Sequence, residues 1–417
     1  MKQRIRTIFL ILLLLSGISD VYAQSCLPEG IVFSLQAQID SFPVNYPGCT
    51  EIEGSVEISG ADITNLSGLA SINTIGGNLI FIFCQSLTSL DGLQSLNRID
   101  STLVFQQNYL LSSLNGLENL SSIGMSLTIL GNSSLTNLAG LEQLSSVGRS
   151  IWIEENYALS SLTGLENLTI VGGDLFVLIS YALKDLQGLD NLTNIGGELY
   201  ISFNNDMSSL TGLEKLVSIG NGIRCSYNMA LTELTALYSL TEVGGQLSIR
   251  SNDALSSLAG LDNINPSSIS DLDISFNNLL STCHVQSICD YLTAPNGEVF
   301  IASNAPGCNS KNAVEDSCAT LDIGEQVLGI EIQLYPNPAI NTLNIRYPIS
   351  DPSTTLRKGV RHLLFIYDLY GRQMDEVRIP AKNQDIRVDV SSYPAGLYFV
   401  VLKDENGIDA RKKFIVK

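Results

Sequence analysis

Histidine and tryptophan are rare in this sequence of 417 residues. The chain has 2 histidines, His284 and His362, which lie far apart, and a single tryptophan, Trp152. Two such distant imidazoles do not provide a histidine-based metal centre or a catalytic triad. No phosphate-binding glycine loop, nucleophile elbow or metal-ligand spacing is present either. The sequence therefore predicts a protein that is not an enzyme and that uses no cofactor and no metal.

Basic residues are also few, and they are unevenly distributed. Residues 24–320 hold 29 acidic and 7 basic residues, which leaves a net charge of −22, whereas residues 321–417 hold 12 acidic and 13 basic residues. The acidic segment repels phosphate backbones, so we expect no nucleic-acid partner. Because 45% of the residues are hydrophobic, the chain can fill a core and is not expected to be disordered.

Long hydrophobic runs are missing apart from one near the amino terminus. Basic residues precede a short apolar run over residues 8–15, and small side chains precede a cleavage site between Ala23 and Gln24. This pattern is typical of a secretory signal peptide, here residues 1–23. The run is shorter than the roughly 20 residues that span a bilayer. We therefore predict an exported protein without a transmembrane segment.

The middle of the chain is a repeat of 24 residues. Its consensus is L-x-I-x-x-N-x-x-L-x-x-L-x-G-L-x-x-L-x-x-I-G-G, and this length and leucine spacing predict a solenoid over residues 55–282. The Leu-x-Ile segment should form a strand with two inward residues and one outward residue between them. Stacked turns then form a right-handed parallel β-solenoid in an all-β protein. Glycine-leucine pairs mark the turns at Gly68, Gly92, Gly116, Gly140, Gly164, Gly188, Gly212 and Gly260, with Ala236 in the one gap.

Two other repeat positions have expected structural roles. A second short extended stretch, residues 120–123 and its equivalents, ends at Gly-Gly corners, where we expect glycine to supply the backbone freedom of a sharp bend. A buried asparagine column should satisfy backbone groups left at a turn. Its members are Asn108, Asn132, Asn156, Asn204, Asn228, Asn252 and Asn277, and Cys84 and Ser180 are its exceptions.

Aromatic residues gather at the outward positions of the predicted sheet, where a solvated face should be polar. The candidate binding residues are Trp152, Phe176 and Tyr200 on consecutive turns, with Phe203 and Tyr227 in a neighbouring column. An exposed apolar patch predicts a recognition surface for a protein or glycan ligand. Two alternatives remain: aromatic cross-strand packing without a ligand, and a structural or adhesive surface component without a discrete ligand.

The eight cysteines of an exported chain predict disulfides rather than a zinc site. Cys26 and Cys49 precede the repeat, in an expected N-terminal cap over residues 24–54. The expected C-terminal cap, residues 283–320, contains Cys283, Cys289, Cys308 and Cys318, for which three pairings are possible. Cys84 and Cys225 lie six turns apart, about 29 Å at the usual strand spacing. They cannot pair with each other, and we expect them to be inert core thiols.

Short alternating apolar runs separated by turn residues follow a linker over residues 321–333. They predict a small immunoglobulin-like antiparallel β-sandwich over residues 334–417. Its sequence blocks resemble the C-terminal sorting domain of type IX secretion substrates. These blocks are Tyr335, Pro336, Asn337 and Pro338, the segments around Gly371 and Gly396, and the terminal Lys-Lys-Phe-Ile-Val-Lys. The resemblance implies recognition by secretion and sorting machinery, passage across a Gram-negative outer membrane, removal of the domain, and a mature protein at the cell surface or released.

The repeat itself resembles the receptor L-domain family. The resemblance rests on Asn-x-x-Leu and Leu-x-Gly-Leu without a helix-length segment, over roughly residues 50–282. It implies a fold and an extracellular setting but no particular ligand. The cysteine spacing after the last turn is similar to the cap of extracellular leucine-rich solenoids. That similarity implies pairing of Cys283 with Cys308 and of Cys289 with Cys318.

Overall fold

The computed structural model describes residues 24–326, 333–346, 363–368, 372–378, 386–404 and 407–417. The expected signal peptide, including Ala23 at its cleavage site, lies outside the described residues. The chain divides into two compact units between Ala313 and Val314, and each unit is described by itself.

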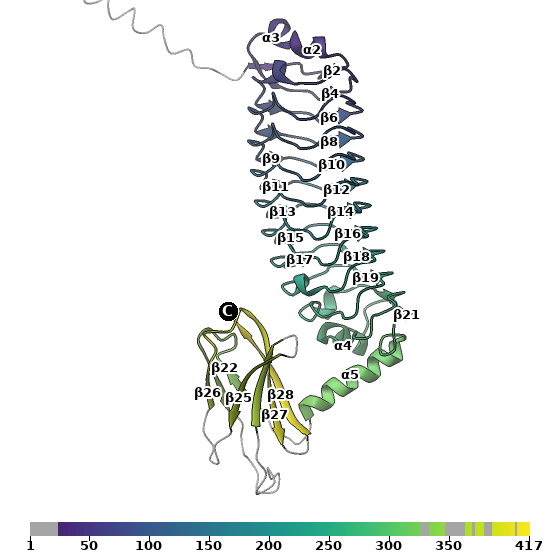
Figure 1. Ribbon diagram of the computed structural model, residues 1–417, viewed down its shortest axis with the longest axis vertical. Helices are drawn as coiled ribbons and strands as arrows, with labels where there is room; N and C mark the ends of the chain where they lie inside the picture. Colours follow the sequence, from purple (N-terminus) through teal and green to yellow (C-terminus); the bar gives the residue numbers. More distant parts are fainter. Residues whose placement is uncertain (1–23, 327–332, 347–362, 369–371, 379–385, 405–406) are drawn as a thin grey trace, which may run out of the picture. The chain divides into compact units, whose positions relative to one another are not determined.

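The first unit is a parallel β-solenoid with stacked turns (Figure 1). One side is a 12-stranded sheet of β2 (Ile31–Phe33), β4 (Val56–Ile58), β6 (Leu79–Ile82), β8 (Leu103–Gln106), β10 (Leu127–Leu130), β12 (Ile151–Glu154), β14 (Leu175–Leu178), β16 (Leu199–Ser202), β18 (Gly222–Ser226), β19 (Gln246–Arg250), β20 (Leu272–Ser275) and β21 (Val299–Ala302). The other is a 9-stranded sheet of β1 (Gln24–Cys26), β3 (Cys49–Ile52), β5 (Thr74–Ile75), β7 (Arg98–Ile99), β9 (Ser122–Ile123), β11 (Ser146–Val147), β13 (Ile170–Val171), β15 (Asn194–Ile195) and β17 (Ser218–Ile219). The predicted parallel solenoid is confirmed.

The two sheets extend beyond the turns that carry the repeat consensus. Strands β1, β2 and β3 lie in the segment expected to be the N-terminal cap, and β21 lies in the segment expected to be the C-terminal cap. Short helices close each end: α2 (Gln36–Asp40) and α3 (Phe42–Asn45) pack against η1 (Ser67–Leu69), and α4 (Gln286–Thr293) packs against η3 (Pro266–Ser268). The first part of the expected linker forms the end of helix α5 (Lys311–Gln326). The short helices α2, α3 and α4 thus cover the terminal turns, as a solenoid requires.

The inward positions of the repeat form one continuous apolar core. The alternation of a strand places Ile151 and Ile153 on the inner side, and both are fully buried. Leu138, Leu141 and Leu144 lie in the segment between β10 and β11 and have no exposed surface. Each turn therefore covers the apolar residues of its two neighbours, which is how a solenoid buries a core that no single turn contains.

The asparagine column forms a buried hydrogen-bond ladder, as expected. In one step, the backbone N–H of Asn132 donates to Oδ1 of Asn156 at 3.0 Å, and Nδ2 of Asn156 donates to the backbone oxygen of Ile129 at 2.8 Å. The same pair of bonds recurs at Asn108, Asn132, Asn204, Asn228, Asn252 and Asn277. The ladder gives an acceptor to the backbone N–H that follows each bend, and its amide groups also donate to carbonyl oxygens of the strands.

The ladder has one weak step and one extra member. Ser180 replaces asparagine, and its hydroxyl donates to the backbone oxygen of Leu178 at 3.2 Å. At the carboxyl end, Oδ1 of Asn304 accepts the backbone N–H of Asn277 at 3.0 Å. Asn304 was not predicted, because it lies 27 rather than 24 residues after Asn277.

The glycine corners have a different physical reason from the one expected. Of the described Gly-Gly corner residues, only Gly244 has a positive φ. The others are needed because turns stack closely: a Cβ on Gly148 would lie 2.1 Å from the backbone oxygen of Gly124. Positive φ occurs instead in the Gly-Leu pairs, for example 112° at Gly140. Where Ala236 replaces that glycine, the turn forms the 3₁₀ helix η2 (Thr235–Leu237).

The second unit contains two antiparallel sheets, as predicted. One comprises β22 (Gln333–Tyr335), β23 (Thr342–Arg346) and β26 (Ile386–Asp389); the other comprises β25 (Gln373–Arg378), β24 (Leu363–Asp368), β27 (Gly396–Asp404) and β28 (Gly407–Val416). Side chains from both sheets share one buried core, including Leu343, Ile366, Val388 and Phe414. This is the packing of a small β-sandwich.

Candidate functional site

Three aromatic side chains occupy matching positions on adjacent strands of the 12-stranded sheet. Trp152 of β12 pairs in register with Phe176 of β14, which pairs with Tyr200 of β16 (Figure 1 shows these strands). Because Ile151 and Ile153 point inward, Trp152 points outward, and it is 37% exposed. Phe176 and Tyr200 are half-buried. The structure thus brings the three predicted residues together on the outer face.

The rings of this row do not form a flat platform. The centroids of Trp152 and Phe176 are 4.6 Å apart with an interplanar angle of 76°, and those of Phe176 and Tyr200 are 6.0 Å apart with an angle of 88°. Neighbouring rings instead pack edge to face, as the quadrupoles of aromatic rings favour. The indole Nε1–H of Trp152 donates to the carboxylate of Glu154 on the same strand.

An arginine of the chain continues the row. The guanidinium of Arg224, which pairs in register with Tyr200, lies 5.0 Å from the centroid of the Tyr200 ring. A nitrogen of the same guanidinium lies 3.4 Å from a carboxylate oxygen of Glu198. Burial raises the pKa of the Glu198 carboxyl, Arg224 opposes that rise, and Asp174 adds to it. The face therefore combines aromatic rings with several carboxylates.

The neighbouring column lies at a sharp bend after each strand and adopts an uncommon backbone conformation. Its residues have φ between 50° and 69°, in the left-handed region: Phe83, Gln107, Gly131, Glu155, Ile179, Phe203, Tyr227, Ser251 and Phe276. Apart from Gly131, each is a residue type for which this region costs roughly 1–3 kcal/mol. The rings of Phe203 and Tyr227 stack 4.6 Å apart at an interplanar angle of 2°, and Phe203 is 43% exposed.

A second exposed ring pair was missed at the sequence level. Tyr157 and Tyr181 directly follow the asparagine column and stack 5.4 Å apart at an interplanar angle of 16°. They are 48% and 43% exposed. Partial burial raises the pKa of the Tyr157 hydroxyl, and the charges of Glu155 and Tyr181 add to the rise. The 24-residue register could have revealed this pair, because both tyrosines occupy the same repeat position.

The cysteines lie where the sequence indicated. Disulfides join Cys26 to Cys49 and Cys283 to Cys308. Cys289 and Cys318 are also disulfide-bonded. The free thiols of Cys84 and Cys225 are buried, and burial raises the pKa of each to about 12. A thiol with such a pKa is protonated and unreactive at neutral pH, in line with the expected inert core thiols.

In the sandwich, the first and last blocks of the sorting motif are in contact. Oδ1 of Asn337 accepts the backbone N–H of Ile415 at 2.9 Å. The backbone N–H of Ala339 donates to the oxygen of Ile415 at 2.7 Å, and that of Lys417 donates to the oxygen of Ala339 at 2.9 Å. Tyr335, Pro336 and Pro338 are exposed. The segment around Asn337 and Ala339, at the start of the domain, is therefore hydrogen-bonded to its last strand, β28.

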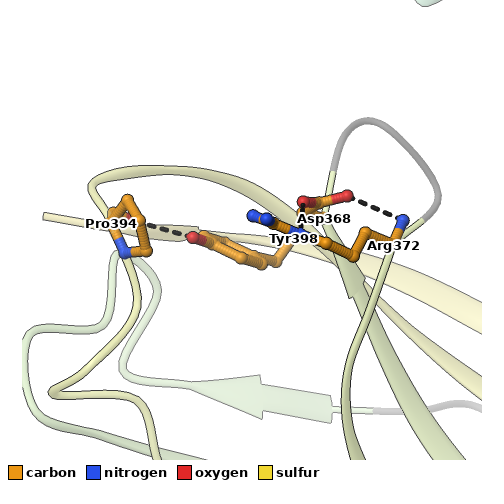
Figure 2. Close-up of polar contacts among 4 residues, drawn as sticks. All are labelled: Asp368, Arg372, Pro394 and Tyr398. Atoms are coloured by element: carbon orange, nitrogen blue, oxygen red, sulfur yellow. Dashed lines mark hydrogen bonds and ion pairs between the residues drawn. The ribbon is translucent and has the colours of Figure 1, made fainter.

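Local hydrogen bonds join residues within each of the two central blocks of the motif (Figure 2). Asp368 accepts the backbone N–H of Arg372 at 2.8 Å and pairs with its Nε at 2.9 Å. The hydroxyl of Tyr398 donates to the backbone oxygen of Pro394 at 2.8 Å, and Gly396 begins β27. The predicted Gly371 lies outside the described residues. These local hydrogen bonds give a structural reason for the residues of the two central blocks.

Neither a metal-binding cluster nor a membrane-spanning helix is present among the described residues. No group of three or more His, Cys, Asp or Glu side chains in that part of the chain is arranged to hold a metal ion. Among the same residues, no helix is both long and apolar enough to cross a membrane.

Comparison with known protein families gives one match in each unit. Residues 48–127 match the family model of the receptor L domain, and residues 333–417 match that of the secretion system C-terminal sorting domain. No curated protein matches the chain. The matches confirm both resemblances inferred from the sequence, although the receptor L domain match covers only the first part of the repeat. The chain thus combines a solenoid whose residues 48–127 match the receptor L domain with a sorting domain that indicates type IX export to the cell surface or the extracellular space.

Proposed function

We propose that the protein is a non-enzymatic recognition protein that binds a partner macromolecule on the outer face of its 12-stranded sheet. We define the ring face as Trp152, Phe176, Tyr200, Phe203 and Tyr227, together with Tyr157 and Tyr181. The observation that carries the proposal is that these exposed and half-buried rings lie on consecutive turns, because large exposed apolar patches are typical of interaction sites.

The backbone of the neighbouring column, at the bend after each strand, supports a role of its side chains beyond folding. Gly131 shows that glycine is accepted at this position, and glycine adopts its left-handed conformation without strain. Phe203 and Tyr227 occupy the same position at a conformational cost. The side chain of Phe203 is exposed, so core packing compensates little of that cost. Ligand contact is a role that an exposed ring on a strained backbone can fulfil.

Edge-to-face packing between neighbouring strands also contributes some stability by itself. A surface component without a discrete ligand would use the rings only in this way. The two roles differ in what a substitution changes: binding in the first case and only stability in the second.

The test is a variant of the full chain with Trp152, Phe176 and Tyr200 all replaced by Ala. It is compared with wild type for binding to arrayed glycans, arrayed proteins and whole cells, and for thermal stability. Truncation of binding hot spots costs at least about 2 kcal/mol each, so we expect binding to fall by more than tenfold with a small loss of stability. Equal binding would refute the proposal, and a collapse of stability would favour the structural role.

A matched control removes apolar side chains of similar exposure from the other side of the solenoid. Ile170 of β13 and Val217, next to β17, are exposed. The Ile170→Ala, Val217→Ala variant should bind as wild type does. A comparable loss of binding in the control would show that general surface hydrophobicity, rather than the ring face, is responsible.

A further inference from the structure

The ring face carries more negative than positive charge. Glu154 and Glu155 follow Trp152 on β12 and its bend, and Asp174 and Glu198 precede the outward positions of β14 and β16. The only guanidinium in contact with the described rings of the face belongs to Arg224. Four carboxylates thus lie on the strands and bends that carry the rings, and one guanidinium contacts a ring.

The chain already shows how this face holds a cation. The Arg224 guanidinium lies between the Tyr200 ring, at 5.0 Å, and the Glu198 carboxylate, at 3.4 Å. A cation over a ring is attracted by the ring quadrupole, and a carboxylate adds Coulomb attraction. A guanidinium also lies over a ring where Arg250 is 5.1 Å from the centroid of the Phe276 ring.

Trp152 and Glu154 repeat this combination without a cation from the chain. Their side chains are joined by a hydrogen bond, which keeps the carboxylate beside the indole. Within the described part of the chain, no Arg or Lys side chain is stacked on Trp152 or paired with Glu154. The exposed ring and its carboxylate are therefore open to a cation from outside.

The carboxylates beside the rings favour a protein over a neutral sugar as the main ligand. In the stacked pairs Phe203 with Tyr227 and Tyr157 with Tyr181, the facing surfaces of the rings cover each other. A sugar and a cation alike can stack only on the ring faces that remain free. The carboxylates beside the rings attract cationic side chains of a protein and have no such effect on a neutral sugar.

We propose that the ring face binds a basic protein segment, with an Arg or Lys side chain of the partner seated at Trp152 and Glu154 and apolar side chains on the neighbouring rings. This inference rests on the proposed function and specifies the class of partner. The charge of the solenoid supports it, because residues 24–320 carry a net charge of −22 and attract a basic partner.

The experiment uses the full chain and synthetic octapeptides that alternate Val with Arg, Ser or Glu, with a neutral hexasaccharide as a further probe. Trp152 is the only tryptophan of the chain, so its fluorescence reports directly on the site. We expect the Arg-Val peptide to shift this fluorescence and to bind more tightly than the Ser-Val peptide, and the Glu-Val peptide to bind least. Added salt should weaken the Arg-Val complex.

A pair of charge-matched variants separates the site from the general field of the solenoid. Glu154→Gln removes one charge but keeps an oxygen that accepts the Trp152 Nε1–H. Glu29→Gln removes one charge from an exposed turn before β2. Loss of an exposed charge pair changes affinity by up to about fivefold. We expect an effect of that size at Glu154 and little change at Glu29.

Three outcomes would overturn the inference. The first is equal weakening by the two variants, which indicates a non-specific field. The second is binding of the Arg-Val peptide no tighter than that of the Ser-Val peptide. The third is binding of the hexasaccharide alone with a change in Trp152 fluorescence. In that third case the ring face would still be a binding site, so the proposed function would stand while the basic partner fails.

Discussion

The solenoid and the sandwich are held together by contacts of different span along the chain. In the solenoid, side chains such as Asn132 and Asn156 bond across 24 residues, and the same contact recurs turn after turn. In the sandwich, Asn337 bonds to Ile415 across 78 residues, and the contact occurs once. The solenoid therefore depends on the quality of each step between turns, whereas the sandwich depends on having both of its ends in place.

This difference explains where sequence blocks are found in each unit. Every solenoid turn must match its neighbours, so the consensus recurs throughout. In the sandwich, the first and last blocks of the motif contact each other, and the central blocks contain local bonds such as that between Asp368 and Arg372. The blocks are far apart in sequence because they are close in the fold.

The largest expected effect is in the solenoid core. Leu141 is fully buried between turns, and Leu141→Ala should lower the free energy of unfolding by about 2–5 kcal/mol through lost burial and a residual cavity. Urea denaturation followed by Trp152 fluorescence measures the solenoid alone, because the sandwich has no tryptophan. An unchanged midpoint would contradict the assigned register of the repeat.

The two hydrogen-bond arrangements should differ next. Asn204→Ala removes the acceptor of the Ser180 N–H and the donor to the Val177 oxygen, both buried. The Ser180 N–H is then left without an acceptor, which costs about 1–3 kcal/mol, so the solenoid midpoint should fall. Asn337→Ala in the sandwich removes one exposed bond and should leave the Trp152 transition unchanged. Its effect should be faster hydrogen exchange at the Ile415 amide; an equal loss from both variants in the Trp152 transition would contradict the division into two units.

The free thiols make the solenoid sensitive to alkaline pH. Burial raises the pKa of Cys84 and Cys225 from 9.0 to about 12. In the unfolded chain they ionise near pH 9, whereas in the folded chain they retain their protons. The resulting stabilisation is complete below about pH 9 and is lost as pH rises toward 12, at about 1.4 kcal/mol per pH unit for each thiol. A Cys84→Ala, Cys225→Ala variant should lose less stability between pH 8 and pH 10.5 than wild type; equal losses would contradict buried thiols.

The smallest expected effect is a gain of stability. Ser180→Asn would restore the ladder step, with Oδ1 accepting the N–H of Asn156 and Nδ2 reaching the oxygen of Ile153. The equivalent bonds of Asn156 measure 3.0 and 2.8 Å. A net hydrogen bond contributes about 1 kcal/mol, so the urea midpoint should rise slightly. A lower midpoint would show that this turn has adapted its packing to serine.

Much of the solenoid could be predicted because its information is local and repeated. The strands at residues 151–154 and 175–178, the buried leucines and the outward position of Trp152 all follow from a period of two within a period of 24. The two-sheet sandwich was predictable in type from short alternating runs. The same register could have revealed Tyr157 and Tyr181, since repeat position alone places them together.

The remaining features depend on contacts between turns, and the tertiary structure alone decided them. The corner at Gly148 needs glycine because the oxygen of Gly124 approaches it, and Asn304 joins the ladder although its spacing breaks the period. The edge-to-face angle between Trp152 and Phe176 likewise results from how two adjacent rings pack. A sequence determines which residues recur at each position, but the approach of atoms 24 residues apart depends on the twist and closeness of the stacked turns. Only the folded chain defines those distances.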